Sequence, residues 1–201
     1  MNRCDIINYY LRLFPQFRSY LEIGVGCGES FNAAEAFDKD GIDIDVNSKC
    51  NYHMSSDDFF QMNQKKYNVV FIDGLHHCDQ VCRDINNSLD CLQDNGIIIV
   101  HDCIPENEVS QKLPQQNGNW VGTVWKAFVL FRCVRQDLEM FVIDTDWGVG
   151  VIKPHRRQKL YAYPEIISDY NLFANCKHEA LNIISVEEWL ARRDTNRSLT
   201  T

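Results

Sequence analysis

The chain has 201 residues, of which 45% are hydrophobic and 24% charged, and this length and composition suit one globular domain. Its formal net charge is −8 and its basic residues form only short clusters, such as Arg156-Arg157, so a nucleic-acid partner is not expected. No stretch approaches the roughly 18 consecutive apolar residues of a membrane-spanning helix, and the N-terminus lacks the pattern of a signal peptide. We therefore expect a soluble protein without a membrane partner.

Nine cysteines are scattered from Cys4 to Cys176, and no two of them form a CxxC pair. An odd, dispersed set is a poor disulfide framework and is typical of free thiols buried as small hydrophobic groups. Free thiols persist in a reducing compartment. We therefore expect the protein in the cytoplasm.

Apolar spacing predicts an alternating series of elements along the chain. An N-terminal helix is predicted to end at Pro15, and the last forty residues are predicted to be helical. Between them we expect strands at 20–23, 41–45, 52–54, 67–72 and 97–100 and helices at 31–37, 57–63, 81–92 and 121–128, with Asn95-Gly96 ending the third of these helices.

Two further strands, 138–143 and 148–152, are joined by only four residues, too few for a parallel crossover. They are predicted to form an antiparallel hairpin, whereas the continuous apolar run at 67–72 indicates a strand buried on both faces of a parallel sheet. The predicted fold class is α/β: a Rossmann-like, doubly wound, mostly parallel seven-stranded sheet with a C-terminal antiparallel hairpin and helices on both faces. We expect one domain, with an N-terminal helix at 1–18, a core at 19–153 and a helical extension at 154–201.

The first strand leads into a glycine-rich turn, in which Gly24, Gly26 and Gly28 alternate after Glu22. Glycines at a strand-to-helix turn let the backbone approach a ligand closely, because no Cβ is in the way. A dinucleotide fingerprint would need glycine or alanine at position 29, where Glu29 stands. The pattern is therefore ExGxGxG, and a tight turn that binds nothing is the alternative.

This ExGxGxG pattern resembles the first motif of the class I S-adenosylmethionine-dependent methyltransferases. The resemblance implies that S-adenosylmethionine binds at Glu22 and the glycines Gly24, Gly26 and Gly28. It also implies that Asp43, at the end of the second strand, holds the ribose hydroxyls, with Asp45 as the alternative.

The same resemblance places the adenine edge at Ser56 and Asp57, after the third strand. An acid at the start of a helix also suits an N-cap, so Asp57 can instead be the N-cap of the following helix. The sequence leaves these two interpretations open.

Two more motifs, Asp73-Gly74-Leu75-His76 and His101-Asp102, follow the fourth and fifth predicted strands. They resemble a methyltransferase subgroup with DGxH and HD motifs, related to metal-dependent sugar and small-molecule O-methyltransferases. The carboxyl ends of neighbouring parallel strands meet at one crevice, so Asp73 and Asp102 are expected to converge. In those relatives the matching acids hold a divalent metal, which implies Mg²⁺ or Mn²⁺ at Asp73 and Asp102, and Asp73 is also expected to contact the cofactor. Leu75 and His101 replace acids found in some of these relatives, so the sequence leaves metal binding open.

Three histidines, His76, His77 and His101, are predicted to lie at the same sheet edge. A neutral imidazole there can accept the proton of a methyl acceptor, and a hydrogen-bonded structural role is the alternative for each. A zinc site that combines His76 and His77 with Cys78 and Cys82 matches no usual ligand spacing.

The sequence thus predicts an S-adenosylmethionine-dependent methyltransferase in which Asp73, His76, His101 and Asp102 carry catalysis. The expected acceptor is a small hydroxyl-bearing molecule, and the motif resemblance suggests a sugar or glycan precursor. A cofactor-binding module without transfer activity and a nicotinamide-dependent oxidoreductase are the alternatives. The oligomeric state is not indicated.

Overall fold

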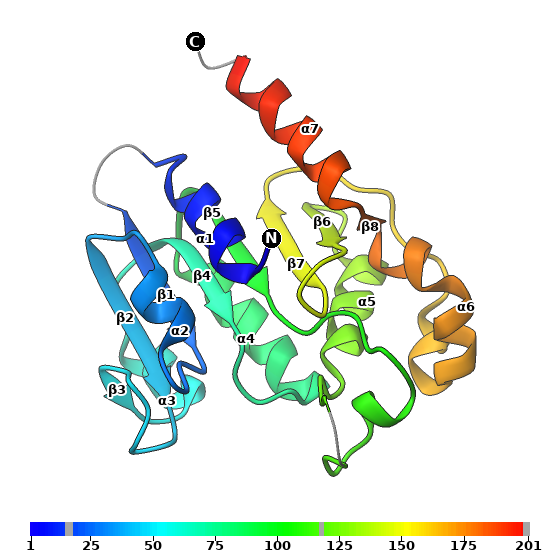
Figure 1. Cartoon of the computed structure of the whole chain (residues 1–201), viewed down its shortest axis with the longest axis horizontal. Helices are drawn as coiled ribbons and strands as arrows, with labels where there is room; N and C mark the ends of the chain where they lie inside the picture. The colour runs from blue at the N-terminus through cyan, green and yellow to red at the C-terminus, as the bar shows by residue number, and fades with distance from the viewer. Residues whose placement is uncertain (15–17, 117–118, 199–201) are drawn as a thin grey trace.

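The computed structural model describes residues 1–14, 18–116 and 119–198, with side chains up to Arg192 (Figure 1). One sheet contains all the strands of the described residues, in the order β3-β2-β1-β4-β5-β7-β6-β8. The strands are β1 (Ser19–Ile23), β2 (Asp38–Asp43), β3 (Tyr52–His53), β4 (Tyr67–Ile72), β5 (Leu92–Val100), β6 (Leu138–Ile143), β7 (Val149–Pro154) and β8 (Ile183–Ile184). The helices are α1 (Arg3–Leu11), α2 (Glu29–Ala33), α3 (Ser56–Met62), α4 (Cys78–Asp90), α5 (Val124–Val134), α6 (Tyr170–Leu181) and α7 (Val186–Ser198), with short 3-10 turns at Val109–Gln111 and Pro164–Ser168.

The strand directions confirm the predicted α/β class. Neighbouring strands from β3 to β5 pair in parallel, β7 pairs antiparallel with both β5 and β6, and β8 pairs in parallel with β6. The predicted hairpin is therefore present, and β7 is the one reversed strand among the described residues. The sheet has eight strands rather than seven, because the two-residue strand β8 lies in a region predicted to be helical and is too short to leave a periodic signal.

The two faces of the sheet are covered by two apolar clusters. In β4, Val70 and Ile72 belong to one cluster and Val69 and Phe71 to the other, as the two-residue period of a strand requires. The first cluster packs against α3, α4, α5 and α6, and the second packs against α1, α2 and α7 (Figure 1). Both faces of the sheet are therefore buried. Side chains of the strands can reach a ligand only at the ends of the strands.

Helix α1 begins at a capping box, in which Asn2 and Asp5 satisfy each other's backbone N–H groups. Its Tyr9 and Tyr10 rings pack edge to face against Trp189 of α7. The helix ends at Leu11. Its first residue, Arg3, lies next to the turn between β6 and β7, where its backbone N–H donates to Asp146. The predicted end at Pro15 lies outside the described residues.

Several predicted boundaries are wrong: β2 spans Asp38–Asp43, β5 already begins at Leu92, and α5 spans Val124–Val134. Two further differences, in α2 and α4, have a visible cause. The helix expected at 31–37 is reduced to α2, because the backbone N–H groups of Phe37 and Asp38 already donate to Arg18 at the start of β1 and draw the chain into β2. Helix α4 ends at Asp90 and not at Asn95-Gly96, because Leu92 already pairs with Tyr67 in the sheet. Among the described residues, no helix has both the length and the apolar character needed to cross a bilayer.

Candidate active site

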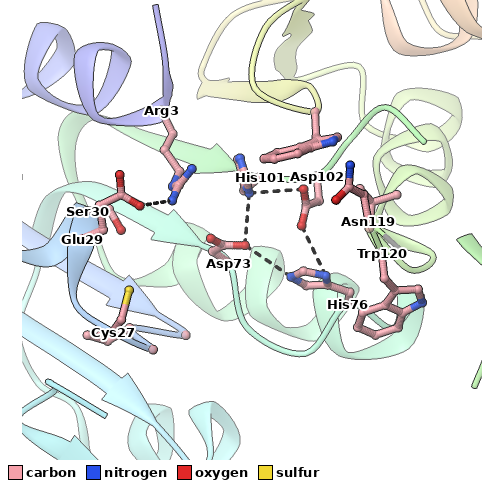
Figure 2. Close-up of a pocket in the computed structure, with 15 residues that line it drawn as sticks. Arg3, Cys27, Glu29, Ser30, Asp73, His76, His101, Asp102, Asn119 and Trp120 are labelled. Carbon is pink, nitrogen blue, oxygen red and sulfur yellow. Dashed lines mark hydrogen bonds and ion pairs between the residues drawn. The ribbon is translucent and has the colours of Figure 1, made fainter. Parts of the chain in front are cut away.

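A cavity of about 380 Å³ lies at the carboxyl ends of β1, β4 and β5. Its wall combines the glycine-rich turn after β1 with side chains that follow β4 and β5, and with residues from α1, the segment before α5 and the β6–β7 hairpin. The lining residues are Arg3, Gly24, Val25, Gly26, Cys27, Glu29, Ser30, Asp73, His76, His101, Asp102, Asn119, Trp120, Val121 and Trp147 (Figure 2). The carboxyl ends of parallel strands are where α/β sheets bind ligands.

The glycine-rich turn forms one wall of this cavity. Gly24 has a φ of +87°, and a Cβ on it would lie 2.1 Å from the carbonyl oxygen of Asp73, so only glycine lets the ends of β1 and β4 approach this closely. Gly26 also has a positive φ, of +52°, but a Cβ there would meet no atom within 4 Å. The open side of Gly26 therefore leaves room for a ligand beside the backbone.

Glu22 does not line the cavity, contrary to its expected role as a cofactor contact. Its side chain is fully buried beneath the turn, where Tyr20 Oη and Ser30 Oγ each donate a hydrogen bond of 2.6 Å to its two oxygens. Burial raises the pKa of Glu22 to about 7, despite these two donors. The structure thus gives Glu22 a supporting position under the turn.

Asp43 lies at the end of β2, as predicted, but outside the cavity lining. Its Oδ2 accepts from the backbone N–H of Gly26 at 2.8 Å, and its Oδ1 accepts from that of Asp45 at 2.9 Å. The backbone N–H of Lys49 donates to Gly26 from the other side, at 3.1 Å. Asp43 therefore holds the glycine-rich turn in place, and its ribose contact remains a prediction.

The two residues expected at the adenine edge also lie outside the cavity lining. Ser56 is buried and donates to Asp84 Oδ1 at 2.6 Å, whereas Asp57 pairs with Arg83 at 3.2 Å. The alternative interpretation of Asp57 as the N-cap of α3 is wrong, because Ser55 is the N-cap and accepts from the backbone N–H of Asp58.

The four predicted catalytic residues come together in one ring in which carboxylates and imidazoles alternate (Figure 2). His76 Nε2 lies 3.3 Å from Asp73 Oδ1, and His76 Nδ1 lies 3.3 Å from Asp102 Oδ2. On the other side, His101 Nδ1 lies 3.3 Å from Asp73 Oδ1 and 3.3 Å from Asp102 Oδ1. The motifs after β4 and β5 thus converge.

The two histidines of the ring differ in exposure and charge. Burial lowers the pKa of His101, but hydrogen bonding to Asp102, Asp146 and Asp73 overcomes this and raises it to about 12. His101 is 5% exposed and its raised pKa favours the protonated form, whereas the side chain of His76 is 16% exposed. For His76, burial lowers the pKa and the same two ring carboxylates raise it above its ordinary value. His76 is therefore the better placed of the two to meet a ligand.

Several residues of the backbone around the ring have positive φ angles, and one of these turns is held by a hydrogen bond. Asp102 has a φ of +60°, in the left-handed region that non-glycine residues rarely adopt. Asp146 and Trp147, in the turn between β6 and β7, also have positive φ values, of 49° and 57°. This turn is anchored by the backbone N–H of Ile104, which donates to the carbonyl of Trp147 at 2.7 Å.

Three residues of the site were not assigned a role by the sequence. Asp146 Oδ1 lies 3.6 Å from His101 Nε2, and Arg3 donates to Asp146 through both its backbone N–H, at 2.8 Å, and its guanidinium. Trp120 stacks on His76, with ring centroids 5.2 Å apart. The four-residue turn between the strands predicted at 138–143 and 148–152 was the signal in the sequence for Asp146, and no motif pointed to Arg3 or Trp120.

Among the described residues, Asp73, His76 and Asp102 form a group whose possible ligand atoms all lie within 4.8 Å of one another. His76 Nδ1 is also buried and, although Asp102 Oδ2 lies 3.3 Å away, it makes no hydrogen bond. Two carboxylates and one imidazole are suitable ligands for a divalent cation such as Mn²⁺. The residues present therefore fit the metal that the motifs implied.

The alternative zinc group does not form in the described part of the chain. His77 is the N-cap residue of α4 and is not among the residues that line the cavity. Cys78 uses its backbone N–H to bond Thr123 Oγ1 at 2.8 Å, and neither Cys78 nor Cys82 joins the metal-binding group.

The fold and the arrangement of its strand ends are those of a Rossmann-like α/β domain with a cavity at the carboxyl ends of its parallel strands. Residues 32–103 match the family described as "Methyltransferase domain", a segment that includes Asp43 and both the DGxH and HD motifs. No curated protein sequence is significantly similar to this chain.

Solved structures of three methyltransferases resemble the chain. The O-methyltransferase TomG from Streptomyces achromogenes, in complex with S-adenosylmethionine, is 15% identical with a TM-score of 0.55, over 77% of this chain and 79% of TomG. The S-adenosylhomocysteine-bound methyltransferase PaMTH1 from Podospora anserina is 16% identical with a TM-score of 0.52, over 71% of this chain and 72% of PaMTH1. The methyltransferase MycE of the mycinamycin pathway, in complex with Mg, S-adenosylhomocysteine and mycinamycin VI, is 14% identical with a TM-score of 0.52, over 76% of this chain and 49% of MycE. The predicted Rossmann-like fold is therefore confirmed, and residues 32–103 match a methyltransferase domain.

Proposed function

We propose that this protein is an S-adenosylmethionine-dependent O-methyltransferase that acts on a small hydroxyl-bearing acceptor. The observation that carries the proposal is that one cavity holds both the glycine-rich turn and the ring of Asp73, His76, His101 and Asp102. Methyl transfer is an in-line displacement, so donor and acceptor must meet in one cavity beside a group that can take the acceptor's proton.

His76 is the proposed base. It is the more exposed histidine of the ring, and the three carboxylates around His101 favour the protonated form of that imidazole. In the transfer step the acceptor oxygen attacks the methyl carbon, the bond from that carbon to sulfur breaks, and the acceptor's proton passes to the imidazole. Asp73 and Asp102 then stabilise the imidazolium, because they lie beside its two nitrogens.

A divalent cation, Mg²⁺ or Mn²⁺, is part of the proposal, with Asp73 and Asp102 as the residues that would hold it, while the imidazole of His76 stays free to take the acceptor's proton. When bound, such a cation supplies a positive charge that lowers the pKa of the acceptor hydroxyl. The Mg in the MycE complex, a protein of similar fold, supports this part of the proposal.

Two aromatic side chains support a ring-bearing acceptor such as a sugar or glycan precursor. Trp120 and Trp147 both line the cavity next to the two histidines of the ring. Indole faces pack well against the C–H faces of a sugar ring, and the polar ring of residues beside them suits its hydroxyl groups. The net charge of −8 favours such an acceptor over a nucleic acid.

We also propose a cytoplasmic location. All nine cysteines are free thiols in the structure. The expected burial is wrong for most of them, since only Cys91 and Cys103 are buried and Cys27 and Cys176 are exposed. Free thiols in these positions are typical of a reducing compartment.

The test is a calorimetric comparison of S-adenosylmethionine, S-adenosylhomocysteine and NAD, followed by radiolabelled methyl transfer to panels of nucleotide sugars, phenolic metabolites, tRNA and proteins. We expect binding of the first two ligands and labelling of a small hydroxyl compound. Asp43→Ala should weaken cofactor binding roughly tenfold or more, from losing charge-assisted hydrogen bonds; Asp45→Ala tests the alternative ribose residue in the same way. Preferential NAD binding, or labelling of tRNA alone, would reject the proposal.

A further inference from the structure

Arg3 is the one arginine or lysine that lines the cavity in the described part of the chain. It extends from the N-terminus of α1 to the space between the glycine-rich turn and the ring of catalytic residues (Figure 2). Its guanidinium lies 2.7 Å from Glu29 and 3.1 Å from Asp146, and its side chain is 19% exposed. The guanidinium of Arg3 thus links α2 to the β6–β7 hairpin, two parts of the cavity wall that are far apart in the sequence.

The partners of Arg3 leave one edge of its guanidinium incompletely used. Asp146 takes Nη1, at 3.3 and 3.1 Å, and is itself 10% exposed. The Nε and Nη2 groups share the other edge, where Glu29 bonds Nη2 alone and Nε has no hydrogen-bond partner in the described residues. A carboxylate can accept from both groups of such an edge at once. The side chain of Glu29 is 61% exposed, so its ion pair is of the weak kind that a ligand displaces readily.

The order of the strands decides which part of the cofactor reaches Arg3. The predicted ribose residue, Asp43, ends β2, and the ring with Asp73 and Asp102 follows β4 and β5, on the other side of β1. The sulfonium of the donor bears three substituents, so when the ribose faces β2 and the methyl group faces the ring, the amino-acid chain is left the remaining wall, which contains Gly24 and Ser30. Arg3 lies on this part of the wall, next to Glu29.

We propose that Arg3 binds the α-carboxylate of S-adenosylmethionine through its Nε and Nη2 edge, an inference that rests on the proposed function. Glu29 leaves that edge when the ligand enters and becomes the partner of the adjacent α-ammonium group. Asp146 keeps its hold on Nη1 and on the backbone of Arg3, so α1 stays fixed while the ligand exchanges with Glu29. The N-terminal helix is thereby a part of the cofactor site and not only a cover for the sheet.

Decarboxylated S-adenosylmethionine, which lacks only the carboxylate, tests this inference by calorimetry. The wild-type protein should bind S-adenosylmethionine at least tenfold more tightly than the decarboxylated ligand. Arg3→Gln should lose about tenfold or more in affinity for S-adenosylmethionine and little for the decarboxylated ligand, so the preference disappears. Arg3→Lys should keep part of the preference, because it retains the charge but not the two-pronged edge.

Arg12→Gln is the matched control, because Arg12 lies beyond the same helix and pairs with an exposed carboxylate, Glu35. It should leave both affinities unchanged. Equal weakening of both ligands by Arg3→Gln would overturn the inference and assign Arg3 a structural role through Asp146. If Arg3→Gln leaves cofactor affinity unchanged but raises the KM for the acceptor, the inference is also overturned, because Arg3 then binds the acceptor and not the carboxylate of the cofactor. If the wild-type protein binds neither ligand, the proposed function itself fails.

Discussion

A Cβ atom on Gly122 would lie 2.1 Å from the carbonyl oxygen of His76. The same carbonyl accepts a hydrogen bond of 2.8 Å from the backbone N–H of Thr123, so the segment before α5 lies directly against the residue proposed as the base. Gly122 has a φ of +59°, which suits glycine and few other residues. The position of His76 is therefore set from two sides, by the loop after β4 and by the start of α5.

Gly122→Ala should displace His76 from the ring. The added methyl group must push the His76 carbonyl away, and a 1 Å misplacement of a reacting group can cost about 100-fold in rate. We expect kcat to fall by at least tenfold while affinity for S-adenosylmethionine is kept, measured by steady-state kinetics and calorimetry. The matched variant Gly26→Ala should keep kcat and lose affinity for S-adenosylmethionine. Its added methyl group meets no protein atom but occupies the space beside the turn that is left for the ligand. A Gly122→Ala enzyme with wild-type kcat would contradict the geometry.

His76→Gln should separate catalysis from cofactor binding. Loss of a general base typically costs about 10²–10⁴ in rate, and the glycine-rich turn does not depend on the imidazole. His77→Gln is the control, since the neighbouring His77 is absent from the cavity lining. We expect the first variant to lose kcat and the second to keep it. Equal activity of the two variants would exclude His76 as the base.

Asp102→Asn should weaken binding of Mn²⁺ at least tenfold, because it removes one of the charged ligand groups beside Asp73 and His76. Titration calorimetry with Mn²⁺ on the unliganded protein measures this without reference to activity. Chelator should also abolish methyl transfer, and Mg²⁺ or Mn²⁺ should restore it. Full activity in chelator, together with absent Mn²⁺ binding, would leave the histidine base without a metal.

Glu22 should make the stability of the protein depend on pH. Its pKa is raised by burial from 4.5 to about 7 in the folded state, so the folded protein holds a proton that the unfolded chain releases. The resulting stabilisation is complete below pH 4.5 and is lost as the pH rises through 7. Glu22→Gln cannot ionise and should lack this change. Relative to the variant, the wild-type free energy of unfolding should fall by about 2–3 kcal/mol between pH 5 and 8, at 1.36 kcal/mol per pKa unit. Parallel pH profiles of the two proteins in urea unfolding would refute the buried-acid account.

The sequence predicted the sheet well because its central strands carry a continuous apolar signal. The run at 67–72 coincides with β4, and the four-residue turn after 143 correctly indicated an antiparallel hairpin. The short helix α2 was overestimated, since Phe37 continues the helical spacing although its side chain is 83% exposed. Periodicity reports where a side chain can be buried, and the pairing of Phe37 and Asp38 with Arg18 decides where the helix ends.

The site was predictable where it follows strand ends and not where it depends on contacts between distant segments. Asp73 and Asp102 could be brought together because parallel strands end at one edge. Arg3 and Asp146 are 143 positions apart and come from a helix and a hairpin that show no shared motif. The burial of Glu22 was also hidden, because a motif acid that contacts a ligand and one that supports the turn have the same sequence.

One cavity is proposed to hold both the methyl donor and a metal next to His76. A crystal structure of the protein with S-adenosylhomocysteine and Mn²⁺ would locate both ligands, using the anomalous signal of manganese. We expect S-adenosylhomocysteine against Gly24 and Gly26 and a manganese peak among Asp73, His76 and Asp102. Cofactor density away from the glycine-rich turn, or manganese bound elsewhere with this group of residues unchanged, would contradict it.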